Sequence, residues 1–382
     1  MNAKGEHLIS GLSGALVAAV LAVGLWEGCA RRQPTQPNAQ AESKIRVDKD
    51  GTIHLPAFAV PLSSYMSKKA RQTFIEQAFH PPVVDSSGPI SKTREDVNKN
   101  FYGPRLERAK AIYPVDIKED KMAGVRVDVI KPRDGVAAAN QNRVVINIHG
   151  GGCQAGAGVG AWVESIPFAG AGKFKVVTVD YRMAPEFAFP AGSEDVAAVY
   201  KELLKQYRPA NIAVYGISCG GLLTAEAVAW FQKEKLPLPG AIGIFDCGAD
   251  ITWGGDSRFI SAPLNVSLGL APPPTPEQVA PHAPAGYFRG ADPADPLVSP
   301  DASLAVLAKF PPTILITGTR DLLMSATLHA HTQLVKAGAE AELFVWEGMG
   351  HSFLADPDTP EAQEAYAAVA KFFDRHLGRT PR

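Results

Sequence analysis

The clearest pattern in the chain is a series of short apolar runs, rich in β-branched residues, that begins near residue 124. Runs of this kind predict β-strands. Both faces of each run are apolar, which is typical of strands buried between two layers of helices. The predicted strands are 125–130, 144–148, 176–179, 212–215, 241–245, 313–317 and 342–346.

Segments with helical spacing lie between these strands, at 193–207, 220–235, 325–337 and 361–377. Alternating strands and helices are typical of a mostly parallel sheet with helices on both faces. We therefore expect residues 123–382 to form one α/β domain around such a sheet. The order of the strands does not follow from the pattern.

Two regions depart from this alternation. Residues 43–122 mix apolar and charged stretches, and within them Ala70, Phe74 and Ala78 recur at helical spacing over 67–79. We expect an irregular, helical N-terminal cap there. Residues about 252–310 are rich in proline and separate two predicted strands. We interpret them as a second cap segment over the carboxyl edge of the sheet, where open α/β sheets bind their ligands.

The first 30 residues have the pattern of an export signal. Lys4 precedes an apolar run over 8–26, and small residues around Cys29 offer a cleavage site. A run of this length is also long enough to stay as a membrane anchor, and lipidation of Cys29 is a minor alternative. Residues 31–42 predict a polar linker. In each case we expect the rest of the chain to be exported, as a periplasmic, cell-envelope or secreted protein.

The charge of the chain is nearly balanced, with 38 Lys and Arg against 39 Asp and Glu among 382 residues. This balance argues against a nucleic-acid partner and suits a small, roughly neutral ligand. The four cysteines are too few for a disulfide framework. Two buried, reduced thiols are the expected state of Cys153 and Cys219 even if the two residues lie close enough to interact, and no disulfide is predicted.

The segment Gly216-Ile217-Ser218-Cys219-Gly220 lies between a predicted strand and a predicted helix. This is the context of a nucleophile elbow, a tight turn that projects a serine hydroxyl from the end of a strand. Glycines are needed on both sides because side chains would clash there, and the N-terminus of the helix favours developing negative charge. We predict that Ser218 is a catalytic nucleophile. The alternative, a chance match in a surface loop, is disfavoured by the apolar flanks.

The segment His149-Gly150-Gly151-Gly152 follows another predicted strand. Consecutive glycines let backbone N–H groups approach a ligand closely, which is how an oxyanion hole is built. We predict that the N–H groups of Gly151, Gly152 and Cys219 are its donors. His149 is predicted to be structural and to hold the loop by hydrogen bonds.

A base and an orienting acid are expected after the serine, at the ends of later strands. Asp321 follows the predicted strand 313–317, and His351 follows 342–346. His351 is predicted to take the proton of Ser218, while Asp321 holds its tautomer. The rivals for these two roles are His282 as base and Asp246 or Asp250 as acid.

With these motifs the sequence resembles the hormone-sensitive lipase family of carboxylesterases from roughly residue 123 onward. Further motifs that carry the resemblance are Asp180–Glu186 (DYRMAPE), 189–191 (FPA) and 295–300 (DPLVSP). The resemblance implies an α/β-hydrolase fold with a cap, and hydrolysis of short to medium acyl esters through an acyl-enzyme without a metal or organic cofactor. It also implies a structural role for Asp180 and Arg182, in a turn that the two residues tie.

Three positions depart from the usual residues of that family. Ile217 stands where Asp is usual, Cys219 stands where Ala is usual, and Cys153 follows the glycines where an aromatic residue is common. We expect an altered acyl pocket. Open alternatives are another acyl hydrolase (an amidase, a lactonase or a polysaccharide deacetylase), a binding protein on a hydrolase scaffold, and a membrane-tethered structural protein. Plant gibberellin receptors, which resemble the family, lack the catalytic histidine, so the presence of His351 weighs against a binding protein.

Overall fold

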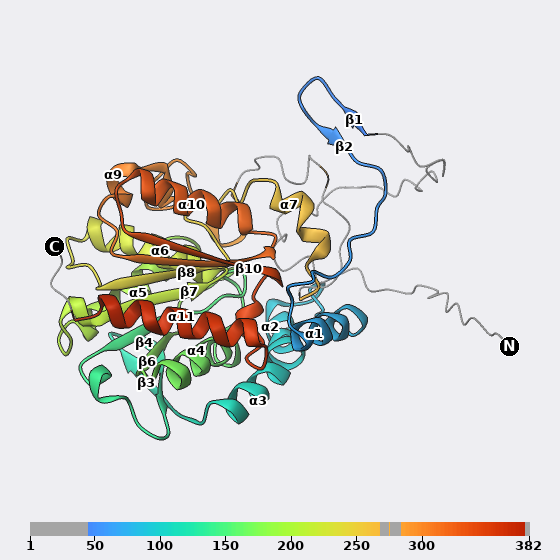
Figure 1. The fold of residues 1–382 in the computed structure, drawn as a ribbon. Helices are drawn as coiled ribbons and strands as arrows, with labels where there is room; N and C mark the ends of the chain where they lie inside the picture. The colour runs from blue at the N-terminus through green and yellow to red at the C-terminus, as the bar shows by residue number, and fades with distance from the viewer. Residues whose placement is uncertain (1–44, 268–274, 276–283, 379–382) are drawn as a thin grey trace.

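A computed structural model describes residues 45–267, 275 and 284–378. Its main feature is an eight-stranded sheet with the order β10-β9-β8-β7-β5-β6-β4-β3 (Figure 1). Neighbouring strands are parallel from β10 to β6, whereas β4 and β3 run antiparallel to their neighbours. The strands are β3 Val115–Met122, β4 Val125–Pro132, β5 Val144–Ile148, β6 Val176–Val179, β7 Ile212–Ile217, β8 Ala241–Phe245, β9 Thr313–Arg320 and β10 Ala341–Gly350. The predicted mostly parallel sheet is thus confirmed.

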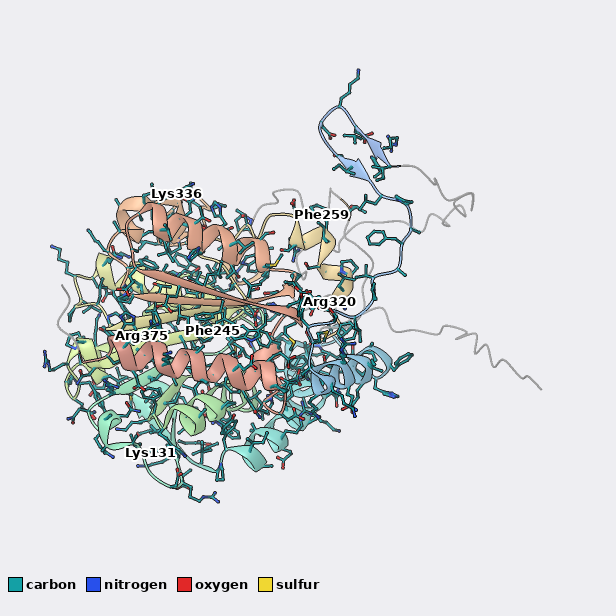
Figure 2. The ribbon with its side chains drawn as sticks, in the orientation of Figure 1. Lys131, Phe245, Phe259, Arg320, Lys336 and Arg375 are labelled. Carbon is teal, nitrogen blue, oxygen red and sulfur yellow. A yellow bond between two sulfur atoms is a disulfide. The ribbon has the colours of Figure 1, made fainter. Side chains whose placement is uncertain are left out.

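Helices cover both faces of this sheet. One hydrophobic cluster joins the sheet to α5 (Ala191–Leu203), α6 (Cys219–Lys233) and α10 (Met324–Lys336), and the other joins it to α4 (Val159–Gly172) and α11 (Pro360–His376). Within β5, Ile146 packs into the first cluster and Val145 into the second. Both faces of a strand are therefore buried, which explains its continuous apolar run. Phe245 is buried within this body, and Figure 2 shows Lys131 and Lys336 at its edges.

Two elements of the body have no counterpart in the sequence prediction. β3 lies within the range 43–122 that we expected to be a helical cap, and only its first residue, Val115, is buried. As an edge strand of mostly charged residues it shows no apolar run. α4 is apolar on nearly every side and contains Pro167, so it has no amphipathic periodicity. Residues 115–122 therefore belong to the sheet and not to the cap.

The remaining described part of the range 43–122 is largely helical. It contains a small hairpin of β1 (Arg46–Val47) and β2 (Ile53–His54), followed by α1 (Lys68–Phe79), α2 (Ile90–Asp96), the π-helix Val97–Tyr102 and α3 (Gly103–Ile112). The hydroxyl of Ser67 caps α1 by accepting from the Ala70 N–H at 3.0 Å. Helices α1 to α3 gather at one end of the sheet, and the hairpin lies away from the main body (Figure 1).

The described part of the insertion runs between β8 and β9. It contains α7 (Ser257–Ile260), several single turns of 3-10 helix and α9 (Leu304–Leu307). The predicted export signal at 1–30 and the linker at 31–42 lie outside the described residues. Within the part of the chain that the structure describes, no helix combines the length and apolar character needed to cross a bilayer.

Candidate active site

Ser218 occupies a strained turn between β7 and α6. Its backbone has φ 57° and ψ −127°, a conformation that side chains rarely adopt and that surrounding structure must impose. A Cβ on Gly216 would overlap the Gly220 carbonyl, and a Cβ on Gly220 would overlap the Ile148 carbonyl. The two glycines are therefore required by the close passage of β5, and the turn holds the serine side chain at the end of the sheet.

The structure brings Ser218, His351 and Asp321 together in one line of hydrogen bonds. The imidazole Nε2 of His351 lies 2.9 Å from the Ser218 Oγ, and its Nδ1 lies 2.8 Å from the Asp321 Oδ1. The residues are 5%, 2% and 0% exposed, in the order Ser218, His351 and Asp321. The three predicted residues thus meet although 133 positions separate the serine from the histidine.

Several neighbours hold the acid and the base in place. The Asp321 carboxylate accepts from the Thr317 hydroxyl at 2.8 Å and from the Leu323 N–H at 2.9 Å. On the histidine, the backbone N–H donates to the Asn265 Oδ1 at 3.0 Å, and the carbonyl accepts from the Ser267 hydroxyl at 2.7 Å. Asn265 and Ser267 belong to the insertion, and no sequence motif marks either residue. The insertion therefore positions the backbone of the histidine.

The predicted oxyanion loop follows β5. Gly151 and Gly152 have φ of 97° and 64°, values that favour glycine. Among the described residues, the N–H groups of Gly151, Gly152 and Cys219 donate no hydrogen bond to another part of the protein. Cys219 starts α6 directly after Ser218, so its N–H also belongs to the positive end of a helix. The loop and the helix start can thus offer donors beside the serine.

A buried carboxyl group holds the start of this loop by a hydrogen bond. Glu164 of α4 accepts from the Gly150 N–H at 2.9 Å and from the Asn147 side chain at 3.4 Å. Burial raises the pKa of Glu164 to about 8, against the lowering effect of these two donors. Glu164 was not among the predicted site residues. Its signal was a single acidic residue in an otherwise apolar, glycine-rich segment.

His149 is buried and does not contact the serine hydroxyl. Its ring stacks on Tyr181 with centroids 4.5 Å apart, and its Nδ1 lies 2.8 Å from the Gly150 carbonyl. Burial lowers the pKa of His149 to about 4, which favours the neutral ring. The residue holds the loop through stacking as well as through its hydrogen bond.

Asp180 and Arg182 do not pair with each other. Asp180 lies 3.6 Å from the Arg126 guanidinium, whereas Arg182 binds the Asp195 carboxylate of α5 at 3.0 Å. Arg182 also donates to the Ala191 carbonyl at 3.1 Å. The two residues tie their segment to β4 and to α5 respectively, rather than closing a turn between themselves.

The rival acids have other partners. Asp246 accepts from the Ser352 N–H at 2.9 Å, and Asp250 accepts from the Thr252 N–H at 2.7 Å. Burial, and then the negative charge of Asp321, raise the pKa of Asp246 well above its ordinary range. Asp246 therefore supports the residue after His351 and does not contact the ring. The rival base, His282, lies outside the described residues.

The expectation of two reduced thiols is wrong. Cys153 and Cys219 form a disulfide, with their Cα atoms 5.6 Å apart. Each cysteine directly follows a predicted oxyanion donor or the nucleophile, so the folding of these two turns brings the sulfur atoms together. The sequence left the approach of the two cysteines open. Cys247 is a buried free thiol.

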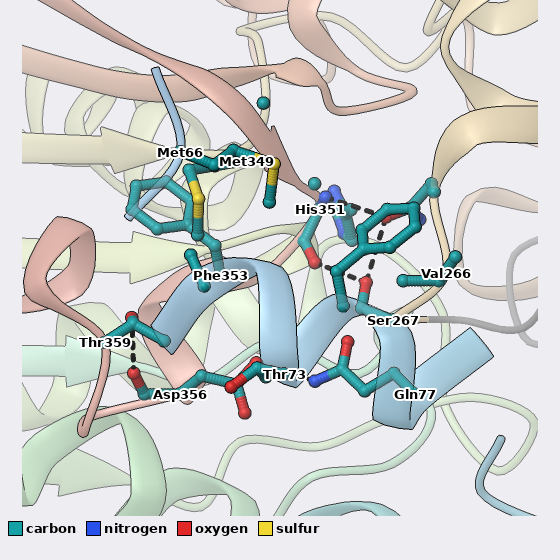
Figure 3. A pocket seen from close by; sticks show the side chains of 15 residues that line it. Met66, Thr73, Gln77, Val266, Ser267, Met349, His351, Phe353, Asp356 and Thr359 are labelled. Atoms are coloured by element: carbon teal, nitrogen blue, oxygen red, sulfur yellow. Dashed lines mark hydrogen bonds between the residues drawn. The ribbon is translucent and has the colours of Figure 1, made fainter. Parts of the chain in front are cut away.

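A small hollow lies between α1 and the end of β10 and reaches His351 (Figure 3). Its wall is mainly apolar and includes Met66, Phe74, Met349 and Phe353. Gln77 lies at the polar end of the hollow and donates to Asp356 at 2.9 Å. Residues in and next to α1 thus form one wall of the hollow beside the histidine.

Chemically, the arrangement offers a hydroxyl next to an imidazole that a carboxylate orients, with N–H donors beside them. Such a set can remove the hydroxyl proton as the oxygen attacks an electrophile, and can stabilise the negative charge that develops. Within the described ranges, no group of three or more His, Cys, Asp or Glu side chains is arranged to hold a metal ion.

Comparison with known proteins gives concordant matches. A family model described as alpha/beta hydrolase fold matches residues 145–355. An esterase from Acinetobacter venetianus is 25% identical over 281 residues, which are 72% of this chain and 88% of the relative. An acetyl-hydrolase from Streptomyces hygroscopicus is 27% identical over 243 residues, 63% of this chain and 78% of the relative.

Solved structures agree with these sequence matches. The crystal structure of esterase E25 is 32% identical, covers 85% of this chain and 98% of its own, and superposes with a TM-score of 0.72. An esterase from the bacterial hormone-sensitive lipase family, 24% identical, covers 82% of this chain and 99% of its own with a TM-score of 0.68. The latter shows the common fold.

Proposed function

The chain belongs to the α/β-hydrolase family of esterases that resemble hormone-sensitive lipase and is a serine hydrolase of carboxylic esters, and we propose that Ser218, His351 and Asp321 carry its chemistry. The observation that supports this proposal most directly is the pair of hydrogen bonds made by His351, at 2.9 Å to the serine and 2.8 Å to the aspartate. This geometry matches the roles of nucleophile, base and orienting acid.

In the proposed reaction, the Ser218 oxygen attacks the ester carbonyl while the Nε2 of His351 takes its proton. Collapse of the tetrahedral intermediate passes this proton to the leaving alcohol and leaves the acyl group on Ser218. Water, activated by the same imidazole, then releases the acid. Asp321 stabilises the imidazolium in both halves of the reaction.

The N–H groups of Gly151, Gly152 and Cys219 are proposed to bind the oxyanion of the intermediate. Their lack of partners among the described residues leaves them available to it. Donors already in place cost no reorganisation as the charge develops, and removing one typically costs about 10²- to 10³-fold in rate.

We propose esters of short to medium acyl chains as the substrates. The hollow beside His351 offers an apolar wall that includes Met66, Phe74, Met349 and Phe353. Relatives named as an esterase and an acetyl-hydrolase point the same way. No cofactor is needed for this chemistry.

The test is a panel of p-nitrophenyl esters from acetyl to palmitoyl, with the anilide and the lactone of one preferred acyl group beside it. We expect the highest kcat/KM among the acetyl to octanoyl esters, and far lower values for the anilide and the lactone. Preference for the anilide or the lactone would replace the ester assignment with an amidase or a lactonase. Ser218→Ala gives the background rate.

We also propose that the protein is exported through its first 30 residues. The apolar run at 8–26 supports this, and a disulfide is more common in oxidising compartments than in the cytosol. Cell fractionation with N-terminal sequencing tests it: a mature chain that begins near residue 30 indicates cleavage, and a membrane-bound full chain indicates an anchor. Soluble full-length protein in the cytosol would refute export.

A further inference from the structure

The disulfide Cys153–Cys219 joins the two segments that supply the oxyanion donors. Cys153 directly follows Gly151 and Gly152 in the loop after β5, and Cys219 is the first residue of α6 after the nucleophile. The N–H of Cys219 is itself one of the three proposed donors. The bridge therefore spans the oxyanion hole itself, although 66 positions separate its two cysteines.

The loop on the Cys153 side has conformational freedom that such a restraint would limit further. Gly151, Gly152 and Cys153 all have positive φ, of 97°, 64° and 57°. Glycines have more conformations to lose than other residues, and a non-glycine residue at positive φ persists only where its surroundings impose it. Noncovalent ties are also present: the Cys153 carbonyl accepts from the Ala184 N–H at 2.9 Å, and the Gly151 carbonyl accepts from the Ala155 N–H at 3.0 Å.

The segment on the Cys219 side is rigid by contrast. α6 is buried along most of its length, and the close contacts of Gly216 and Gly220 fix the elbow against β5. A covalent bond from this rigid helix start to the glycine loop holds the loop donors at a constant distance from the Cys219 N–H. Cys153 and Cys219 are buried, at 0% and 2% exposure, so the bridge is part of the packed interior around the site.

We propose that this disulfide positions the oxyanion hole, and that ester hydrolysis is consequently sensitive to the redox state of Cys153 and Cys219. The proposal rests on the esterase function above. A dithiol such as dithiothreitol supplies two electrons and two protons: the protein S–S bond breaks, two S–H groups form, and the reductant closes its own disulfide. The loop then loses its covalent tie, and its N–H groups no longer stay aligned with the developing oxyanion.

The effect is expected on the transition state and not on substrate binding. Donors must lie 2.7–3.1 Å from the oxyanion, and a loosened loop meets this condition less often. We expect reduction to lower kcat by about tenfold or more, toward the loss seen when one donor is removed, while KM changes little. Affinity for a trifluoromethyl ketone, which forms an oxyanion on the serine, should fall in parallel with kcat. Affinity for the matching methyl ketone should not.

The experiment compares oxidised enzyme, enzyme reduced by dithiothreitol, reoxidised enzyme and the double variant Cys153→Ala/Cys219→Ala. Thiol titration verifies two new thiols per reduced chain, and circular dichroism verifies that each form is folded at the assay temperature. Cys247→Ala is the matched control, because it removes the buried free thiol and keeps the bridge. It should respond to reduction as the wild type does.

The expected result is a reversible loss of kcat on reduction, reproduced by the double variant. An unchanged kcat in folded, reduced enzyme would overturn the proposal, as would equal losses of affinity for both ketones. Unfolding of both bridge-free forms would also overturn it, since the bridge would then serve stability rather than alignment. Failure of the oxidised enzyme to hydrolyse any ester would instead refute the function on which the proposal rests.

Discussion

The Nδ1 of His351 lies 2.8 Å from the Oδ1 of Asp321, and their side chains are 2% and 0% exposed. The carboxylate selects the histidine tautomer that leaves Nε2 free to accept the serine proton. Asp321→Asn removes this selection and the charge that stabilises the imidazolium. We expect kcat to fall by about 10⁴-fold with the fold intact, measured as steady-state ester hydrolysis.

Asp246→Asn is the matched control for this variant. Asp246 contacts the Ser352 N–H and lies beside the Asp321 carboxylate, not the imidazole; an amide can still accept the first hydrogen bond and donate to the carboxylate. Burial and the charge of Asp321 raise the pKa of Asp246, so its neutral form is already favoured. A far smaller loss is expected, and equal losses in the two variants would show that the acid is wrongly assigned.

Glu164 makes the stability of the protein depend on pH. Burial raises its pKa from 4.5 to about 8 in the native state. Between these two values the unfolded chain binds fewer protons than the native chain, so the free energy of unfolding contributed by Glu164 falls as pH rises. Glu164→Gln removes this titration. Relative to wild type it should gain stability from about pH 5 to about pH 8, by at most about 5 kcal/mol at 1.36 kcal/mol per pKa unit.

Urea unfolding of both proteins at several pH values measures this difference. Glu76→Gln, which removes an exposed carboxylate from α1, is the matched control. A stability difference between Glu164→Gln and wild type that stays constant with pH would contradict the raised pKa.

Asn265 links the insertion to the catalytic histidine. Its side-chain oxygen accepts from the His351 N–H at 3.0 Å, and Asn265→Ala leaves that buried donor unpaired, at a cost of about 1–3 kcal/mol. We expect a lower kcat with a smaller change of KM, because the imidazole is displaced from the serine. Asn211→Ala removes a hydrogen bond from the side-chain amide to the Asn142 carbonyl, away from the site, and should leave both constants unchanged. Wild-type kcat in Asn265→Ala would mean that the insertion does not position His351.

The sequence predicted those parts of the molecule in which local chemistry restricts the chain. The central strands are apolar on both faces because both are covered, and the turn around Ser218 tolerates only glycine at Gly216 and Gly220. β3 and α4 were missed because one is a charged edge strand and the other is buried on all sides, so neither carries an amphipathic period.

Features set by tertiary contacts were harder to predict. Asn265 is an ordinary polar residue in a proline-rich segment until the fold places it against the His351 backbone. The bond between Cys153 and Cys219 depends on how two distant turns approach each other. Glu164 could have been recognised, since an acidic residue in an apolar helix must find partners or stay neutral.

Active-site labelling with an organophosphonate tests the central claim most directly. The reagent should add to one residue, found by peptide mass spectrometry to be Ser218, with ester hydrolysis lost in proportion to labelling. Ser218→Ala should fold, take up no label and show only background hydrolysis, since it lacks only one hydroxyl. Labelling of another residue, or hydrolysis by Ser218→Ala at the wild-type rate, would contradict the account.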